Sequence, residues 1–147
     1  MKKFFAPMFA PMFALLVAAC AVVDPSEEVG RTLDLMNQAY RDKDIAAFME
    51  FVSKNYNGER DELKIAVEND FAGFAAVDYS TSVARTVIDG ETGVYGAKVS
   101  FTRSARSKRL GTDHRVGDVC VTFEKDDGGT LRLLQMSKPE LYGLIVP

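Results

Sequence analysis

The chain has 147 residues, of which 47% are apolar and 27% are charged, with 18 basic side chains, 21 acidic side chains and no Trp. This length supports one modest hydrophobic core, and the composition excludes a disordered tail, a collagen-like fibre and a disulfide-rich miniprotein. One His and two Cys are too few for the usual nitrogen and sulfur ligand sets of zinc. No metal and no cofactor is expected.

The N-terminal segment has the layout of an export signal. Lys2 and Lys3 precede an uncharged apolar run, 4–19, that stops at Cys20. Residues 17–20, Val-Ala-Ala-Cys, resemble the lipobox of bacterial lipoproteins, in which an aliphatic residue and two small residues precede a Cys that receives a lipid. The resemblance implies that residues 1–19 are a signal peptide, that Cys20 is lipidated, and that 20–25 form a short linker.

This resemblance implies a location in the bacterial cell envelope, with the membrane as a partner through the lipid on Cys20. Ala21 follows the Cys, which implies the outer membrane, facing the periplasm, if two membranes are present. The alternatives are a plain signal peptide and an uncleaved membrane helix, the latter because residues 4–23 are 20 residues without a charge. Pro7 and Pro11 weigh against the membrane helix, since each removes a backbone donor that a lipid-exposed helix needs.

Charge is unevenly distributed in the remaining chain. Without the two lysines of residues 1–19, it carries 16 basic and 21 acidic side chains, a net charge of −5, so nucleic acid is not an expected partner. The segment 103–115 nevertheless has a net charge of +4. Its bases are Arg103, Arg106, Lys108, Arg109 and Arg115. They form a candidate patch for an anionic partner, and the alternative is a loop kept soluble by its charge.

Three helices are predicted at the start of the domain over 26–147. Asp24 followed by Pro25 predicts a helix start, and an apolar stripe continues it at helical spacing through Val29, Leu33, Met36 and Tyr40. Asp44 predicts the start of a short second helix. A third helix is expected over 61–74, with Leu63, Ala66, Val67, Phe71 and Phe74 inward and Glu62, Glu68 and Asp70 outward.

From Val77 onward, apolar residues alternate with polar ones, which predicts strands. Four strands are expected, at 77–87, 94–103, 113–124 and 131–137, joined by Gly-containing turns. Connections this short permit only antiparallel pairing. The prediction is therefore an α+β domain with N-terminal helices packed on a curved four-stranded antiparallel sheet.

This layout resembles the nuclear transport factor 2-like, or cystatin-like cone, superfamily, which includes SnoaL-like and ketosteroid isomerase-like proteins. The resemblance covers residues 26–137 and rests on the residues 40–49, Tyr-Arg-Asp-Lys-Asp-Ile-Ala-Ala-Phe-Met, and on the four terminal strands. It implies a sheet wrapped around the first helices, often with a cavity at the wide end, and permits a homodimer through the open sheet face. Many members have a strand pair between the second and third helices, where only 53–60 is available here.

The resemblance also implies a candidate pocket for a small ligand. Its expected lining is Tyr40, Phe48, Tyr79, Arg85 and Phe101, with Asp78 as a further candidate. Catalytic relatives place a carboxylate in such a pocket, but no Asp or Glu interrupts the apolar face of any predicted strand, and Asp78 alternates away from it. No catalytic residue is therefore assigned.

Three arginines, Arg85, Arg103 and Arg115, occur at positions where the alternation predicts an inward side chain. Either a bulge shifts the alternation, or the arginines line a cavity mouth suited to a carboxylate or phosphate. Cys120 lies between valines and is expected to be buried, whereas His114 is expected to be exposed near a hairpin tip. The apolar segment 141–147 is expected to pack back on the helices.

The favoured function is a lipid-anchored, exported binding or assembly module of the cell envelope, whose partner is a small ligand or an envelope protein. The alternative is a ketosteroid isomerase-like or SnoaL-like enzyme acting on a small apolar substrate in the cone. A carboxylate in a closed cavity favours the enzyme, and a filled core or an open groove favours the module.

Overall fold

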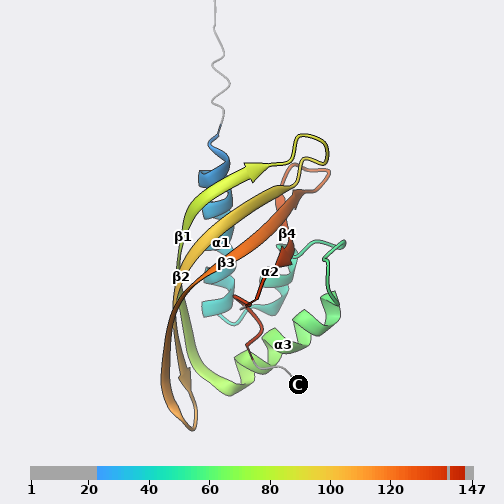
Figure 1. The fold of residues 1–147 in the computed structure, drawn as a ribbon. Helices are drawn as coiled ribbons and strands as arrows, with labels where there is room; N and C mark the ends of the chain where they lie inside the picture. The colour runs from blue at the N-terminus through green and yellow to red at the C-terminus, as the bar shows by residue number, and fades with distance from the viewer. Residues whose placement is uncertain (1–22, 139, 145–147) are drawn as a thin grey trace, which may run out of the picture.

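The computed structural model describes residues 23–138 and 140–144, and it places three helices on one side of an antiparallel sheet (Figure 1). The elements are α1 (Pro25–Arg41), α2 (Ile45–Glu50), α3 (Arg60–Gly73), β1 (Phe74–Ile88), β2 (Tyr95–Ser107), β3 (Gly111–Lys125) and β4 (Leu131–Met136). The predicted signal peptide, 1–19, and the predicted lipidation site, Cys20, lie outside the described residues. Within 23–138 and 140–144, no helix is both long enough and apolar enough to cross a membrane.

The first two helices begin where the sequence predicts. The Asp24 carboxylate accepts a hydrogen bond from the Ser26 amide at 2.9 Å, and the Asp44 carboxylate accepts one from the Ala47 amide at 2.9 Å. Each acceptor satisfies a backbone donor that the first turn of a helix leaves free. All four residues of the predicted stripe in α1 are buried: Val29, Leu33, Met36 and Tyr40.

The turn between α1 and α2 also holds the end of α3. Lys43 adopts a left-handed backbone conformation (φ 56°), which ends α1. Its ammonium group donates to the carbonyl oxygens of Phe71 at 2.9 Å and Phe74 at 2.7 Å. A cation is favourable at the C-terminal end of a helix, so this lysine fixes α3 against the first helix pair.

The sheet has the strand order β1-β2-β3-β4, and each neighbouring pair is antiparallel, which confirms the predicted meander. The expected inward residues of β2 and β3 are buried: Tyr95, Ala97, Val99, Phe101, Val119, Val121 and Phe123. β1 departs from simple alternation at a register shift between Val83 and Arg85. The extra residue places Arg85 opposite Lys98 and leaves Val87 exposed. Simple alternation predicts an inward Arg85, and the bulge turns it outward.

The short segment after α2 is bonded to the backbone of β4. The Ser53 amide donates to the Leu133 carbonyl at 2.9 Å, and the Asn57 amide donates to the Leu134 carbonyl at 2.7 Å. These bonds occupy part of the outer edge of β4, which an open sheet would otherwise expose to edge-to-edge association.

Helix α1 runs antiparallel to β1, which gives the domain two distinct ends. The Asn37 side chain bonds Thr81 at 3.0 Å, and the Arg41 side chain is paired with Asp78 at 2.8 Å. The start of α1 therefore lies near the end of β1, and the β2–β3 hairpin lies at the opposite end of the sheet (Figure 1).

Candidate functional site: the cone interior and an arginine pocket

The helices and the sheet bring three of the predicted pocket residues together in the interior. Tyr40 from α1, Phe48 from α2 and Tyr79 from β1 are all buried. The ring centroid of Tyr40 lies 5.4 Å from that of Phe48 and 5.4 Å from that of Tyr79, in edge-to-face geometry. Such pairs add stability beyond the burial of their area.

The space beside these rings is filled by the chain's own Tyr142. Its ring centroid lies 5.3 Å from Tyr40, 5.0 Å from Phe48 and 5.3 Å from Tyr79, and its exposed fraction is 0%. Its hydroxyl donates to the Asn37 side-chain oxygen at 2.7 Å. Leu141 is also fully buried, so the expected packing of the C-terminal segment on the helices is confirmed for these residues.

A buried carboxylate anchors the same segment. Asp70, from α3, is fully buried and accepts hydrogen bonds from the Tyr40 hydroxyl and, at 2.7 Å, from the Leu144 amide. The Tyr40 hydroxyl also accepts from the Gly143 amide at 3.2 Å, and the Tyr79 hydroxyl donates to the Leu141 carbonyl at 2.6 Å. The interior polar groups thus bind the backbone of residues 141–144.

The outward orientation predicted for Asp70 is wrong. Asp70 follows Leu63 and Val67 at steps of four and three residues, the spacing of one helix face, and both of those residues are buried. The spacing therefore indicates an inward side chain, whereas the outward prediction rested on the charge of Asp70. Burial is tolerated because donors, among them the Tyr40 hydroxyl and the Leu144 amide, bond to the carboxylate.

Burial sets the protonation state of the phenols in the interior. It raises the pKa of Tyr40, Tyr79 and Tyr142, because removing a phenolate from water is costly. The positive charge of Arg103 acts in the opposite direction on the pKa of Tyr79. All three phenols are therefore neutral hydrogen-bond donors at neutral pH and not bases.

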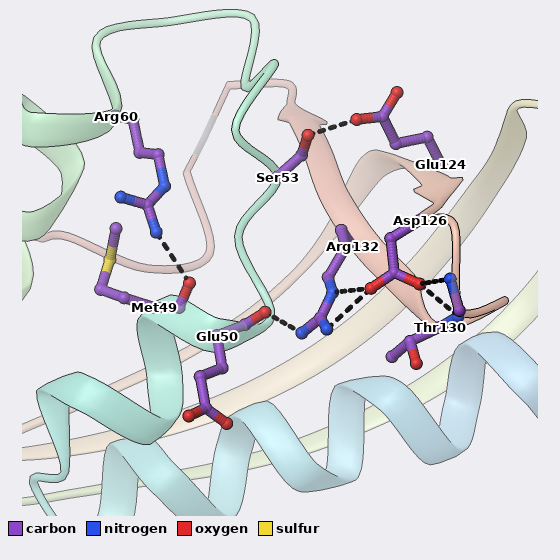
Figure 2. A network of polar contacts seen from close by, with 9 residues as sticks. Met49, Glu50, Ser53, Arg60, Glu124, Asp126, Thr130 and Arg132 are labelled. Carbon is purple, nitrogen blue, oxygen red and sulfur yellow. Dashed lines mark hydrogen bonds and ion pairs between the residues drawn. The ribbon is translucent and has the colours of Figure 1, made fainter.

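A polar groove lies elsewhere, between α2, the segment after it and the β3–β4 turn (Figure 2). Its volume is about 570 Å³. The Arg132 guanidinium donates to Asp126 at 2.8 Å and to the Glu50 carbonyl, and the Ser53 hydroxyl donates to Glu124. These contacts hold the β3–β4 turn against α2. Arg60 also lines the groove and donates to the Met49 carbonyl at 3.1 Å, while its Nε has no hydrogen-bond partner among the described residues.

A smaller pocket, of about 340 Å³, lies on the inner face near the β2–β3 hairpin. Phe101 and Arg103 of β2 line it, together with Arg115 of β3. Arg103 is only 6% exposed, whereas the Arg115 side chain is 63% exposed. The alternation predicted inward side chains for these two arginines, and in the structure both side chains form part of the wall of this pocket.

The other predicted site residues lie apart from this pocket. Arg85 is exposed on the outer face, and Asp78 is exposed and paired with Arg41. The remaining members of the basic patch, Arg106, Lys108 and Arg109, are exposed at or next to the hairpin tip. The structure therefore divides the predicted pocket residues between the filled interior, the arginine pocket and the outer face.

Two further side chains bear on chemistry. Cys120 is exposed, so the predicted burial is wrong: its neighbours Val119 and Val121 face inward, and a strand points alternate residues to opposite faces. His114 is exposed as expected. Among residues 23–138 and 140–144, no group of three or more His, Cys, Asp or Glu side chains could hold a metal ion.

No protein-family model matches the sequence, and no curated protein matches it. Among solved structures, the chain is similar to a conserved protein from Planctomyces limnophilus, with a TM-score of 0.66 and 13% identity over 77% of this chain and 94% of that chain. A ketosteroid isomerase-like protein from Erwinia carotovora atroseptica gives a TM-score of 0.60 and 12% identity over 77% of this chain and 93% of that chain. A provisionally assigned dehydratase of the nuclear transport factor 2-like family from Streptomyces avermitilis gives a TM-score of 0.61 and 11% identity over 75% and 92%. At these identities the likeness concerns architecture alone: helices packed on an open four-stranded antiparallel sheet, the nuclear transport factor 2-like fold.

Proposed function

We propose that the protein is a lipid-anchored, exported binding or assembly module of the bacterial cell envelope. The observation that carries the proposal is the filled interior: Leu141 and Tyr142 occupy the space in which an enzyme with this fold would need its substrate. The lipobox-like residues 17–20 support the anchor, which would hold the protein in the outer membrane, facing the periplasm, if two membranes are present.

The two ends of the domain suit this role. A lipid on Cys20 lies five residues before the start of α1 at Pro25, whereas the basic hairpin lies at the other end of the sheet. The distance from the middle of the sheet to the hairpin follows from the register. Val99 of β2 lies opposite Val83 of β1, and Ser107, at the end of β2, is eight positions further along the strand, or about 26 Å at 3.3 Å per residue. The hairpin would therefore face away from the anchoring membrane, toward an acidic partner in the envelope.

The two cysteines of the chain allow a matched test of the anchor. The full chain is expressed in a bacterium supplied with a labelled fatty acid, together with the Cys20→Ser and Cys120→Ser variants. Label and membrane association are expected in the wild type and in Cys120→Ser, and both should be lost in Cys20→Ser. Label that persists in Cys20→Ser, or an unlabelled wild type, would refute the lipid anchor.

A second function, a ketosteroid isomerase-like or SnoaL-like enzyme, has one observation in its favour. The buried pair of Asp70 and Tyr40 provides a carboxylate and a neutral phenol inside the cone, a combination suited to proton abstraction next to a stabilised oxyanion. Residues 141–144 would have to leave before a substrate could enter. Turnover of a small apolar substrate by the wild type that is lost in Asp70→Asn, with the fold intact, would favour the enzyme over the module.

A further inference from the structure

Arg103 is a buried cation that interacts with the neutral phenol of Tyr79 and with an exposed carboxylate, that of Asp113. Its side chain is 7% exposed, and its ion pair with Asp113 has a nitrogen–oxygen distance of 3.4 Å to a carboxylate that is itself largely exposed. Its buried Nε has no hydrogen-bond partner among the described residues. Burial of a charged group is costly unless the group is paired and hydrogen-bonded, so this guanidinium has capacity for another anion.

The pocket around Arg103 has an excess of positive charge. Three bases, Arg103, Arg115 and Lys138, line it with one acid, Glu140, and a second acid, Asp113, lies beside it and pairs with both arginines. Lys138 and Glu140 lie 3.2 Å apart, but the Lys138 side chain is 87% exposed and sits on a long flexible stem. The Arg115 side chain is 63% exposed, and its nitrogen–oxygen distance to Asp113 is 3.7 Å. Arg115 and Lys138 can therefore turn toward an anion that binds Arg103.

The rest of the lining is apolar. The Phe101 ring lies over Gly117 of the neighbouring strand, where a Cβ would come within 3.2 Å of the ring. A glycine at this position lets the ring lie against β3 and keeps the pocket open. Val116 and Leu144 add aliphatic surface beside it.

We propose that this arginine pocket binds a small organic carboxylate with an apolar body. The carboxylate accepts hydrogen bonds from the Arg103 guanidinium and from Arg115 or Lys138, and the apolar body lies against Phe101. The planar fork of arginine matches a carboxylate through two parallel hydrogen bonds, and a volume of about 340 Å³ suits a ligand of this size. This inference names the ligand class of the binding module proposed above, but it does not depend on the lipid anchor.

Benzoate is the probe for the test, because it joins a carboxylate to a flat apolar ring. The full chain, purified in a nonionic detergent, is titrated by calorimetry at constant ionic strength with benzoate, benzamide and phenyl phosphate. We expect saturable benzoate binding that weakens at least tenfold in Arg103→Gln and about threefold in Arg115→Gln. Arg85→Gln, an exposed arginine outside the pocket, should bind as the wild type does. Benzamide, which lacks the charge, should not bind.

Several results would overturn the proposal. These are no benzoate binding up to about 10 mM, equal binding of benzamide, or equal weakening by Arg85→Gln and Arg115→Gln. Tighter binding of phenyl phosphate than of benzoate would refute the carboxylate class. If Arg103→Gln does not fold, Arg115→Gln and benzamide still decide, because Arg115 is exposed. A chain that carries lipid on Cys20 yet ignores benzoate would refute the pocket alone.

Discussion

Replacing Tyr142 by alanine tests whether residues 141–144 are part of the hydrophobic core or are only weakly bound to the rest of the domain. The Tyr142 side chain is fully buried and lies against the rings of Tyr40, Phe48 and Tyr79. A buried tyrosine covers about 150–250 Å², worth about 4–6 kcal/mol at 25 cal/mol per Å². The truncation also leaves the Asn37 oxygen without its donor, which adds about 1–3 kcal/mol.

The two terms are not additive, because the cavity can partly collapse or admit water. We therefore expect Tyr142→Ala to lower the free energy of unfolding by about 4–6 kcal/mol, a large fraction of the stability of a domain. Tyr142→Phe keeps the ring and loses only the hydroxyl, so its expected cost is about 1–2 kcal/mol. Urea unfolding followed by circular dichroism measures both values.

Tyr56 provides the matched control, because it is a half-buried tyrosine outside the cluster of interior rings. Tyr56→Ala should cost clearly less than Tyr142→Ala. A cost below about 1 kcal/mol for Tyr142→Ala would refute the reasoning, since it would mean that the segment leaves the interior easily. That result would also remove the main argument against an enzyme in the cone.

Three further predictions rest on other parts of the domain. Burial raises the pKa of Tyr40, Tyr79 and Tyr142 above the unfolded value of 10.0, so the free energy of unfolding is unaffected below pH 10 and falls as the pH rises further. Urea unfolding should show that the free energy of unfolding falls by about 3 kcal/mol between about pH 10 and 11. A smooth tyrosinate titration without unfolding would contradict this. Cys120 should react with a thiol reagent in the native state, detected by mass spectrometry, and protection would refute its exposure. Asp44→Ala should lower the free energy of unfolding by about 1 kcal/mol through loss of the α2 cap, and an unchanged urea midpoint would contradict that role.

Local rules account for the parts of the fold that the sequence predicted well. The caps at Asp24 and Asp44 act within three residues, and the strand alternation through Val99 and Phe101 needs only a two-residue period. Short turns forced the antiparallel order of the four strands. Each of these signals lies within a few neighbouring residues, so no tertiary contact was needed to read it.

The remaining features depend on contacts between distant parts of the chain. The bulge that turns Arg85 outward exists only in the pairing of β1 with β2. Asp70 is buried because a hydroxyl from α1 and an amide near the C-terminus reach it. The apolar tail was expected to pack on the helices, but its spacing alone could not show that Tyr142 would enter the cone. The candidate site could therefore not be predicted without the fold, whereas most helices and strands could be predicted from the sequence.

The positions of Asp70 and Arg103 separate the two proposed functions more sharply than the fold does. Asp70 is committed to the backbone of the segment that closes the interior, so chemistry there requires the loss of core contacts around Tyr142. Arg103 needs no such rearrangement, because its pocket is already open beside Gly117. A ligand that binds at Arg103 can therefore enter the folded domain at the end opposite the start of α1. For a protein tethered through Cys20, binding there would proceed without displacing either the membrane anchor or the core.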